Sequence, residues 1–380
     1  MSKLDEVIKN INSKLKNEIV TKDIDAVTFN TRSVVPFISP ALTFMFRDGF
    51  KTNTFWQFIG GESSSKTTTA LAILGAFQKY YKKKWEDRVA ELQAIDKPNK
   101  TEKKELADLL DSGYKKVAYI DVEHNADSEW ASKMGFDIYD CVYVKVQDES
   151  AETIYDIIDE LIASDGICLV LLDSIGSMVS QMQMEKSIGD RTFGGVSMAT
   201  SNWVNRVKPM LHKYDCSIIA INQIRDVINS QFPATRYPGG HALSHACDVI
   251  LSFRRSKPID EDFKEVANKS DYYFGQYFEI HLDKCRIYKP DRKLTRQAIV
   301  FDKGLYPLLD TVNIAIDYGI ITKSGAWFTF EDEQGNPRID SEENTMKWQG
   351  LTGVIKYFET HEKEYSELFD LVDKKVRENS

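Results

Sequence analysis

Short apolar runs that alternate with helix-like segments constrain the fold of this 380-residue chain more than any other feature. The runs with the length and composition of buried strands are Trp56–Ile59, Val117–Asp121, Cys141–Val146, Ile167–Asp173, Ser217–Asn222, Asp248–Phe253 and Tyr277–Leu282. Residues 67–81, 150–164 and 198–213 have helical periodicity between them. Such alternation predicts an α/β fold with a mostly parallel sheet and helices on both faces. Ligands of these sheets bind at the carboxyl ends of the strands.

The composition is that of a globular chain, with 42% hydrophobic and 28% charged residues. No apolar run approaches the roughly 18 residues that a membrane span needs. The five cysteines occur singly, without a CxxC pair, which favours free thiols in a reducing compartment. The histidines show no zinc-type spacing, so no structural metal site is expected.

Three parts are expected along the chain. Residues 1–32 carry apolar side chains at helical spacing, which predicts a helical arm that packs either on its own core or on a neighbouring subunit. Residues 33–305 hold the alternating pattern of the core. Within them, the charged segment 79–116 predicts a helical hairpin, either a solvated surface excursion or a contact with nucleic acid or a partner. Residues 306–380 predict a small mixed α/β domain that ends in a charged helix.

The segment after the first of these runs has the spacing of a phosphate-binding loop. It reads Gly60-Gly61-Glu62-Ser63-Ser64-Ser65-Lys66-Thr67-Thr68 and precedes a helix. Backbone N–H groups and the helix N-terminus can hold phosphates there, Lys66 would lie on the β- and γ-phosphates of ATP, and Thr67 would bind Mg²⁺. Ser65 stands where a glycine is usual; if that position needs a positive φ, serine costs about 1–2 kcal/mol relative to glycine. The alternative is an ordinary Ser/Thr-rich turn.

Two carboxylates follow other strand-like runs. Asp173 ends an apolar run in a Walker B pattern and would hold Mg²⁺ through water. Glu123 follows the run that ends at Asp121, and it is the candidate base for a water nucleophile near the γ-phosphate. The alternative for this second segment is a helix N-cap cluster with Asp127 and Ser128.

Several segments in this order together resemble the RecA family of recombination ATPases. They are Gly61–Thr68, Asp121–Asp127, Leu172–Gly176, Ile221–Arg225, Pro238–Leu243 and Gly325–Phe328. The resemblance runs from about residue 33 to the end. It implies a RecA-type P-loop ATPase core with a small α/β C-terminal domain, and an ATP- and Mg²⁺-dependent protein that forms helical filaments on single-stranded DNA and exchanges strands with double-stranded DNA. Ser65 and the segment 79–116 resemble phage recombinases of the UvsX type, which implies the cytoplasm of a bacterium or of a phage-infected host.

The resemblance also assigns roles at matching positions. Glu123 looks like the residue that activates water, and Asp127 and Trp130 look like the adenine contacts. Gln223 looks like the sensor of the γ-phosphate. Lys284 and Arg286 resemble a basic pair that reaches the ATP of the neighbouring subunit, so full activity would require assembly.

Two long stretches without regular periodicity are the candidate DNA-binding loops. The first, residues 179–197, holds Arg191, Phe193 and Gly194; the second, residues 224–240, holds Arg225, Phe232, Arg236, Gly239 and Gly240. Arginine can meet phosphate and an aromatic ring can stack on a base, and the resemblance matches Phe193 to an apolar wedge. The net charge of −9 argues only weakly against DNA, because the local charge decides. The alternative is a pair of surface loops without a ligand.

Two other classes of protein share such a core. One is a ring-shaped motor of the replicative helicase kind, against which the absence of a sizeable N-terminal domain in this sequence argues. The other is a non-hydrolysing regulatory relative. Ser65 suggests this class, but the complete set of predicted catalytic residues argues against it. Loader and single-strand-binding proteins are further expected partners of a recombinase.

Overall fold

The structure is a computed structural model, and it describes residues 3–15, 32–185, 195–223, 225–226, 235–236, 240–267, 273–289, 293–332 and 334–378. The chain divides into two units, Met1–Ser33 and Val34–Ser380. In the first unit, helix α1 (Lys3–Leu15) has acidic residues in its first turn and a lysine in its last, which suits the helix dipole. Leu4, Val7 and Ile11 are exposed on this helix.

The second unit is built on a central sheet with nine strands among the described residues, in the order β13-β12-β11-β10-β3-β7-β6-β4-β5. In sequence order the strands are β3 (Phe55–Gly60), β4 (Lys116–Asp121), β5 (Val142–Lys145), β6 (Ile167–Asp173), β7 (Ser217–Gln223), β10 (Val249–Ile259), β11 (Gly275–Cys285), β12 (Leu294–Val300) and β13 (Gly304–Leu305). In this order, the neighbouring strands from β10 to β5 are parallel, and β11, β12 and β13 add an antiparallel edge. The predicted fold class is confirmed.

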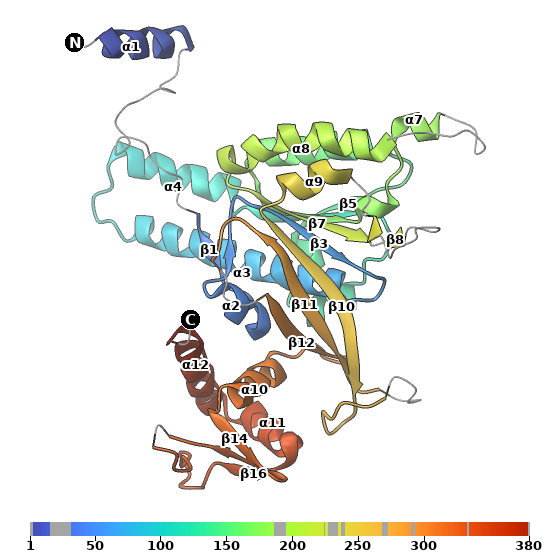
Figure 1. The fold of residues 1–380 in the computed structure, drawn as a ribbon. Helices are drawn as coiled ribbons and strands as arrows, with labels where there is room; N and C mark the ends of the chain where they lie inside the picture. Colours follow the sequence, from blue (N-terminus) through green and yellow to red (C-terminus); the bar gives the residue numbers. More distant parts are fainter. Residues whose placement is uncertain are drawn as a thin grey trace. The chain divides into compact units, whose positions relative to one another are not determined.

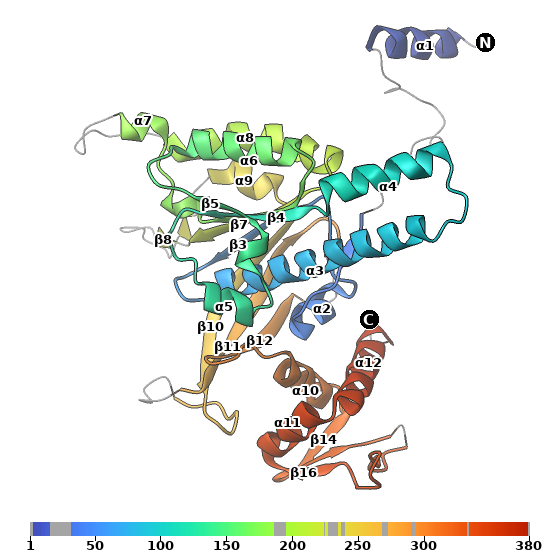
Figure 2. The same cartoon turned by 180° about the vertical axis from the view of Figure 1, so that it is seen from behind.

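Helices cover both faces of this sheet (Figures 1 and 2). One face packs on α2 (Pro40–Phe46), α3 (Lys66–Gln93) and α5 (Ser128–Lys133), and the other on α6 (Ala151–Ala163), α8 (Gly195–Lys213) and α9 (Gly240–Ala246). Successive residues of β6 pack on opposite faces of the sheet. Leu171 packs in the apolar cluster of the first face and Leu172 in that of the second. A strand buried on both faces has to be apolar throughout, which is why β6 is recognisable from its sequence.

The charged segment 79–116 forms the predicted helical hairpin, with one difference. Its first arm is not a separate helix, because α3 continues without a break from the phosphate loop to Gln93. The second arm, α4 (Lys100–Ser112), begins with a capping box. Trp85 donates from Nε1 to the carbonyl of Leu109 over 2.8 Å, and Arg88 forms a two-pronged ion pair with Glu105. These contacts hold the arms together.

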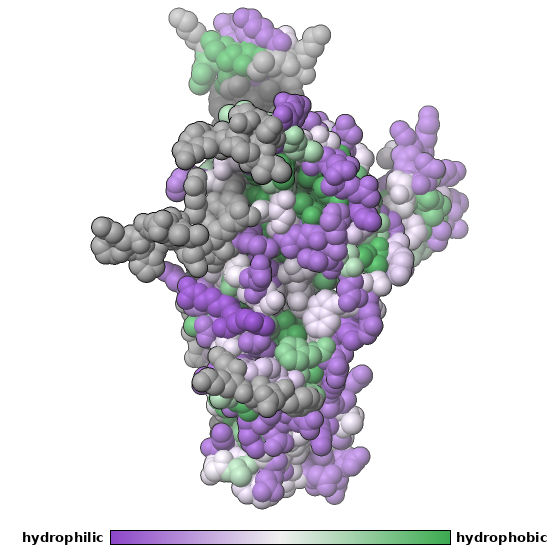
Figure 3. All heavy atoms as spheres, turned by 90° about the vertical axis from the view of Figure 1, so that its right-hand side faces the viewer, coloured by the Kyte–Doolittle hydropathy of each residue, from purple (hydrophilic) through white to green (hydrophobic). Residues whose placement is uncertain are grey.

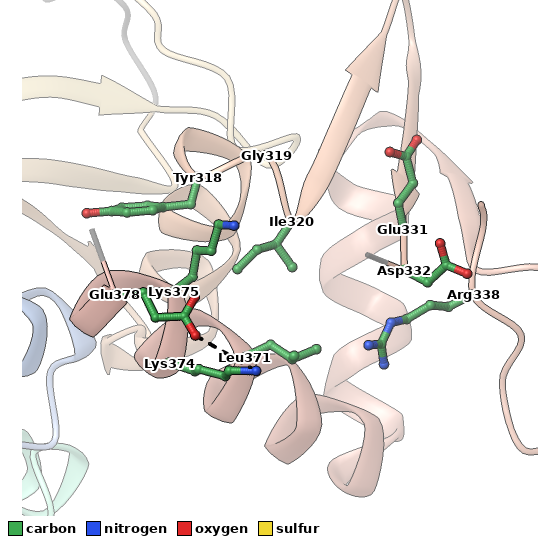
Figure 4. A pocket seen from close by; sticks show the side chains of 10 residues that line it. All are labelled: Tyr318, Gly319, Ile320, Glu331, Asp332, Arg338, Leu371, Lys374, Lys375 and Glu378. Carbon is green, nitrogen blue, oxygen red and sulfur yellow. Dashed lines mark ion pairs between the residues drawn. The ribbon is translucent and has the colours of Figure 1, made fainter. Parts of the chain in front are cut away.

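The C-terminal segment contains α10 (Pro307–Asp317), a sheet of β14 (Ile321–Ser324), β15 (Trp327–Phe330) and β16 (Lys347–Gln349), and helices α11 (Gly350–Thr360) and α12 (Glu362–Glu378). One apolar cluster joins it to the core, since Phe44, Tyr277 and Ala298 pack with its side chains. A cleft of about 230 Å³ opens in this segment (Figure 4). It is lined by charges of both signs, with Lys374 and Glu378 paired at 3.9 Å, and by none of the predicted ATP- or DNA-binding residues.

In the part of the chain that the structure describes, we find no helix with the length and apolar character needed to cross a bilayer. The boundaries at residues 32 and 305 remain predictions.

Candidate nucleotide-binding and catalytic site

The phosphate loop lies where β3 ends and α3 begins. Gly60 is packed so closely on β10 that a Cβ there would lie 2.5 Å from the carbonyl oxygen of Phe253, so a side chain has no room. Gly61, Glu62 and Ser63 are exposed, and the first turn of the 28-residue helix α3 follows them. An exposed loop at the positive end of a long helix is an arrangement that binds anionic phosphate.

Lys66 is the first residue of α3 and is only 6% exposed. Its ammonium donates hydrogen bonds to the carbonyls of Gly60 at 3.2 Å and Gly61 at 2.6 Å, so it lies within the loop. Burial lowers the pKa of this lysine, while the nearby acids Asp173, Glu123 and Glu62 oppose that shift. The structure therefore holds a buried cation beneath the loop and beside a group of carboxylates.

Ser65 adopts φ 74° and ψ 11°, which is the left-handed conformation. Position 65 therefore has the positive φ at which serine was expected to be less stable than glycine. The hydroxyl of Ser65 accepts a hydrogen bond from Nε2 of Gln297 at 3.4 Å, and the same amide reaches Thr69 at 2.5 Å. Gln297 is fully buried on β12, and its hydrogen bonds link the start of α3 to the sheet.

Thr67 and Asp173 form the candidate Mg²⁺ site. The Thr67 hydroxyl donates to Oδ2 of Asp173 over 2.7 Å. Asp173 ends β6 and is 5% exposed, and burial raises its pKa to about 7, with repulsion from Glu123 and Asp121 adding to the effect. A hydroxyl and a buried carboxylate are hard oxygen ligands of the kind that Mg²⁺ prefers, and Lys66 offsets only part of the negative charge around them, so these residues fit the ion.

Glu123 lies in a turn that Asp121 shapes. Asp121 ends β4, is buried, and accepts hydrogen bonds from the Ala126 backbone at 3.2 Å and the Tyr143 hydroxyl at 2.7 Å. His124 takes up φ 57° within this turn. The turn presents the Glu123 carboxylate to the ends of β6 and β7, where Gln223 donates to it from Nε2 over 3.0 Å.

Gln223 is the last residue of β7 and lies in register with Gly60 of β3. The structure therefore brings five predicted residues together at the carboxyl ends of the parallel strands. They are Lys66, Thr67, Glu123, Asp173 and Gln223.

Two side chains that the sequence reasoning missed also reach Glu123. Ser174 and Ser177 both donate to its Oε1, the latter over 3.0 Å. Their signal in the sequence was weak: each is a serine shortly after the strand that ends at Asp173.

The predicted adenine contacts lie along the side of α3. Asp127 is the N-cap of α5 and accepts from the backbone of Glu129 and Trp130, so the N-cap alternative holds for this residue. Trp130 is half-buried and donates from Nε1 to the hydroxyl of Thr68 over 3.2 Å. An indole ring is thus fixed beside the second threonine of the phosphate loop.

Lys284 and Arg286 lie near the amino ends of the parallel strands, whereas the phosphate loop lies at their carboxyl ends. Cys285, between them, pairs with Val249, the first residue of β10, whereas Phe253 of the same strand pairs with Gly60. Four residues of strand separate these levels, which is roughly 13 Å. The Lys284 ammonium donates to the carbonyl of His245 over 3.0 Å, and burial, together with the charge of Arg286, lowers its pKa. The pair cannot serve the phosphate loop of its own chain.

Most of the predicted DNA-binding residues lie outside the described residues: Arg191, Phe193, Gly194, Phe232 and Gly239. The backbone of the second loop is described at two short strands, β8 (Arg225–Asp226) and β9 (Thr235–Arg236), in which Arg225 pairs with Arg236. Gly240, at φ 72°, begins α9. Hydrophilic side chains prevail among the described residues of the side of the molecule toward which α7 (Gln181–Met184) and β8 project (Figure 3).

A P-loop followed by strands with acidic ends, on a sheet in this order, defines the class of P-loop proteins with a RecA-type core. The family model described as RecA N-terminal domain matches residues 86–306, more than half of the chain. The chain belongs to the RecA family. Because the matched range begins after the phosphate loop, that loop is assigned from its own geometry.

Curated relatives extend the match over most of the chain. "Protein RecA" of Aquifex aeolicus is 29% identical over 87% of this chain and 79% of its own length. "Protein RecA, chromosomal" of Lactococcus lactis is 29% identical over 87% and 71%, and "Protein RecA" of Thermus aquaticus is 27% identical over 73% and 69%. The chain is a recombination and repair protein that acts through DNA strand exchange.

Proposed function

We propose that the chain is a DNA-dependent ATPase that polymerises on single-stranded DNA and exchanges strands in the ATP-bound state. The observation that carries the proposal is the meeting of Lys66, Glu123 and Gln223 at one edge of the sheet, with the Thr67–Asp173 pair beside them. Family membership supports the reaction class. Each role follows from what the side chain can do at its position.

Hydrolysis requires a water to attack the γ-phosphorus while a base accepts its proton. Glu123 is the proposed base, and Lys66 would offset the charge that grows on the β- and γ-phosphates as the bond between them breaks to give ADP and phosphate. Thr67 and Asp173 would hold Mg²⁺, which would neutralise phosphate charge. Gln223 contacts the base and directly precedes the second DNA loop, so it can transmit the state of the nucleotide to DNA.

Lys284 and Arg286 complete the site of a neighbouring subunit. Their place near the amino ends of the parallel strands, away from the phosphate loop of the same chain, supports action in trans. Action in trans requires neighbouring subunits, so the proposed active form is a polymer. The predicted loops 179–197 and 224–240 would line the DNA path, with Arg191, Arg225 and Arg236 on phosphates and Phe193 and Phe232 against bases. Binding of this kind weakens with salt.

We further propose that the chain is of the phage UvsX type. Two features support it: the serine at the left-handed position of the phosphate loop, and the long hairpin of α3 and α4. Loader and single-strand-binding proteins are its proposed partners.

The test of the catalytic assignment is Glu123→Gln. The variant should bind ATP and DNA as the wild type does, but its DNA-stimulated turnover should fall about 100-fold or more, since a general base contributes roughly 10²–10⁴ in rate. Glu129→Gln, an exposed glutamate on α5, is the matched control and should keep full turnover. Turnover of Glu123→Gln within a few-fold of the wild type would remove the base assignment.

A further inference from the structure

The oxygen Oε1 of Glu123 accepts hydrogen bonds from three side chains at once. Ser177 Oγ and Gln223 Nε2 each donate over 3.0 Å, and Ser174 Oγ is the third donor. A carboxylate oxygen offers about two lone pairs, so three donors leave it saturated. Among the described residues, the other oxygen, Oε2, receives only a long contact of 3.4 Å from the Asn125 amide. These three donors also fix the orientation of the carboxylate, so it can turn toward a water at the γ-phosphate only after it loses a donor.

The three donors differ in how firmly the fold holds them. Ser174 directly follows β6 and has no exposed surface, so it is a fixed anchor. Ser177 is exposed and ends the short 3₁₀ turn η3 (Ile175–Ser177), two residues before the predicted first DNA loop at 179–197. Gln223 ends β7, directly before the second loop at 224–240. One contact of Glu123 thus comes from the root of each loop.

We propose that Ser177 is a positioning residue that couples the first DNA loop to the base, in parallel with Gln223 and the second loop. This inference rests on the proposed role of Glu123. The Ser177 hydroxyl restrains the carboxylate while no DNA is bound. When DNA engages the first loop, the turn that carries Ser177 shifts, the hydrogen bond to Oε1 breaks, and the base is free to accept a proton.

Ser177 is the donor best suited to be released. Its Oγ lies 3.3 Å from that of Ser174, so after Ser177 leaves, the buried serine still keeps the carboxylate at the end of β6. Because Ser177 is exposed, replacing it with alanine removes its hydroxyl contacts with Glu123 and Ser174 and leaves no buried cavity. The effect of the substitution therefore reports on the restraint rather than on folding.

The experiment compares ATP turnover without DNA and with saturating single-stranded DNA. For Ser177→Ala, we expect DNA-free turnover to rise about three- to tenfold, because one charge-assisted hydrogen bond no longer holds the base. Turnover with DNA should stay within about twofold of the wild type, since DNA has already broken that bond. Ser177→Thr keeps the hydroxyl and should restore the low DNA-free rate. Ser112→Ala is the matched control, because its exposed hydroxyl bonds only to backbone carbonyls at the end of α4.

DNA-free turnover of Ser177→Ala at or below the wild-type level would overturn the proposal. A structural defect cannot mimic the expected result, since it would lower turnover rather than raise it. Glu123→Gln in the same assay separates the two levels of inference. If that variant is inactive and Ser177→Ala stays at the wild-type DNA-free rate, only the restraint is wrong; if Glu123→Gln is active, the base assignment itself fails.

Discussion

The hydroxyl of Thr67 donates a hydrogen bond of 2.7 Å to the carboxylate of Asp173, which joins the first turn of α3 to the end of β6. The two residues lie 106 positions apart in the sequence, and each belongs to a different motif. Their contact places the candidate phosphate-binding loop and the candidate Mg²⁺ ligand Asp173 in one site. The proposed chemistry depends on this juxtaposition.

Asp173→Asn should weaken ATP binding at least about tenfold in the presence of Mg²⁺, because an amide loses the charge that holds the ion. Affinity without Mg²⁺ should change little. The measurement is a titration of a fluorescent ATP analogue at several Mg²⁺ concentrations. Asp165→Asn, which removes only an exposed pair with Lys115, is the control. An undiminished response to Mg²⁺ in Asp173→Asn would contradict the assignment.

Ser65→Gly should stabilise the folded chain by about 1 kcal/mol. Glycine relieves the left-handed strain, and its greater conformational entropy in the unfolded chain offsets part of that gain. Ser64→Gly is the matched control. Ser64 has no positive φ, and its hydroxyl donates to Gly61 over 2.8 Å, so its replacement should destabilise. Thermal unfolding of both variants provides the comparison. A lower melting temperature for Ser65→Gly would show that the bond from Gln297 outweighs the strain.

Asp310 on α10 predicts a pH dependence of stability. Burial raises the pKa of its carboxyl well above the usual value. Although Oδ1 accepts from the Ala298 backbone, Oδ2 has no hydrogen-bond partner among the residues that the structure describes. A carboxyl whose pKa is higher in the folded than in the unfolded chain binds more protons when folded, so its contribution becomes less favourable as pH rises above the unfolded pKa of about 3.9.

Asp310→Asn should remove that loss. Relative to the wild type, the variant should gain roughly 1–2 kcal/mol on going from about pH 5 to about pH 8, measured as a growing difference in melting temperature. Asp340→Asn is unsuitable as a control, because its carboxylate organises a turn; Asp165→Asn serves instead. A constant difference across this range would show that Asp310 does not titrate with folding.

Lys284→Ala should lower DNA-stimulated turnover more than it lowers nucleotide binding. Lys284 lies near the amino ends of the parallel strands and Glu123 at their carboxyl ends, so the two residues of one chain would serve different ATP molecules of one filament. An equal mixture of Lys284→Ala and Glu123→Gln should therefore recover about one quarter of wild-type turnover, the share of interfaces with both residues intact. Complete inactivity of the mixture would mean that Lys284 and Glu123 of one chain act on the same ATP.

The sequence was sufficient for β6 and for the phosphate loop, for reasons that the structure makes plain. A strand buried on both faces must be apolar along its whole length, and a loop that wraps phosphate needs a fixed spacing of small residues before Lys66 and Thr67. Both constraints act on neighbours in the sequence. They therefore leave a local pattern that can be read directly.

Contacts between distant segments left no such pattern. Gln297 bonds to Ser65 across 232 positions, and in its strand β12 it follows the polar residues Thr295 and Arg296, so the strand does not read as a buried run. Ser177 reaches Glu123 only because the turn after β6 folds toward the end of β4. The unbroken length of α3 could not be read either, because its charged second half lacks the apolar periodicity of the first.

The most direct test of the account is ATP hydrolysis with and without single-stranded DNA, combined with negative-stain microscopy of the same samples. The account predicts strong stimulation by DNA together with helical filaments, since the site is completed in trans. Ring-shaped particles, or DNA-independent turnover by dispersed single subunits, would contradict it.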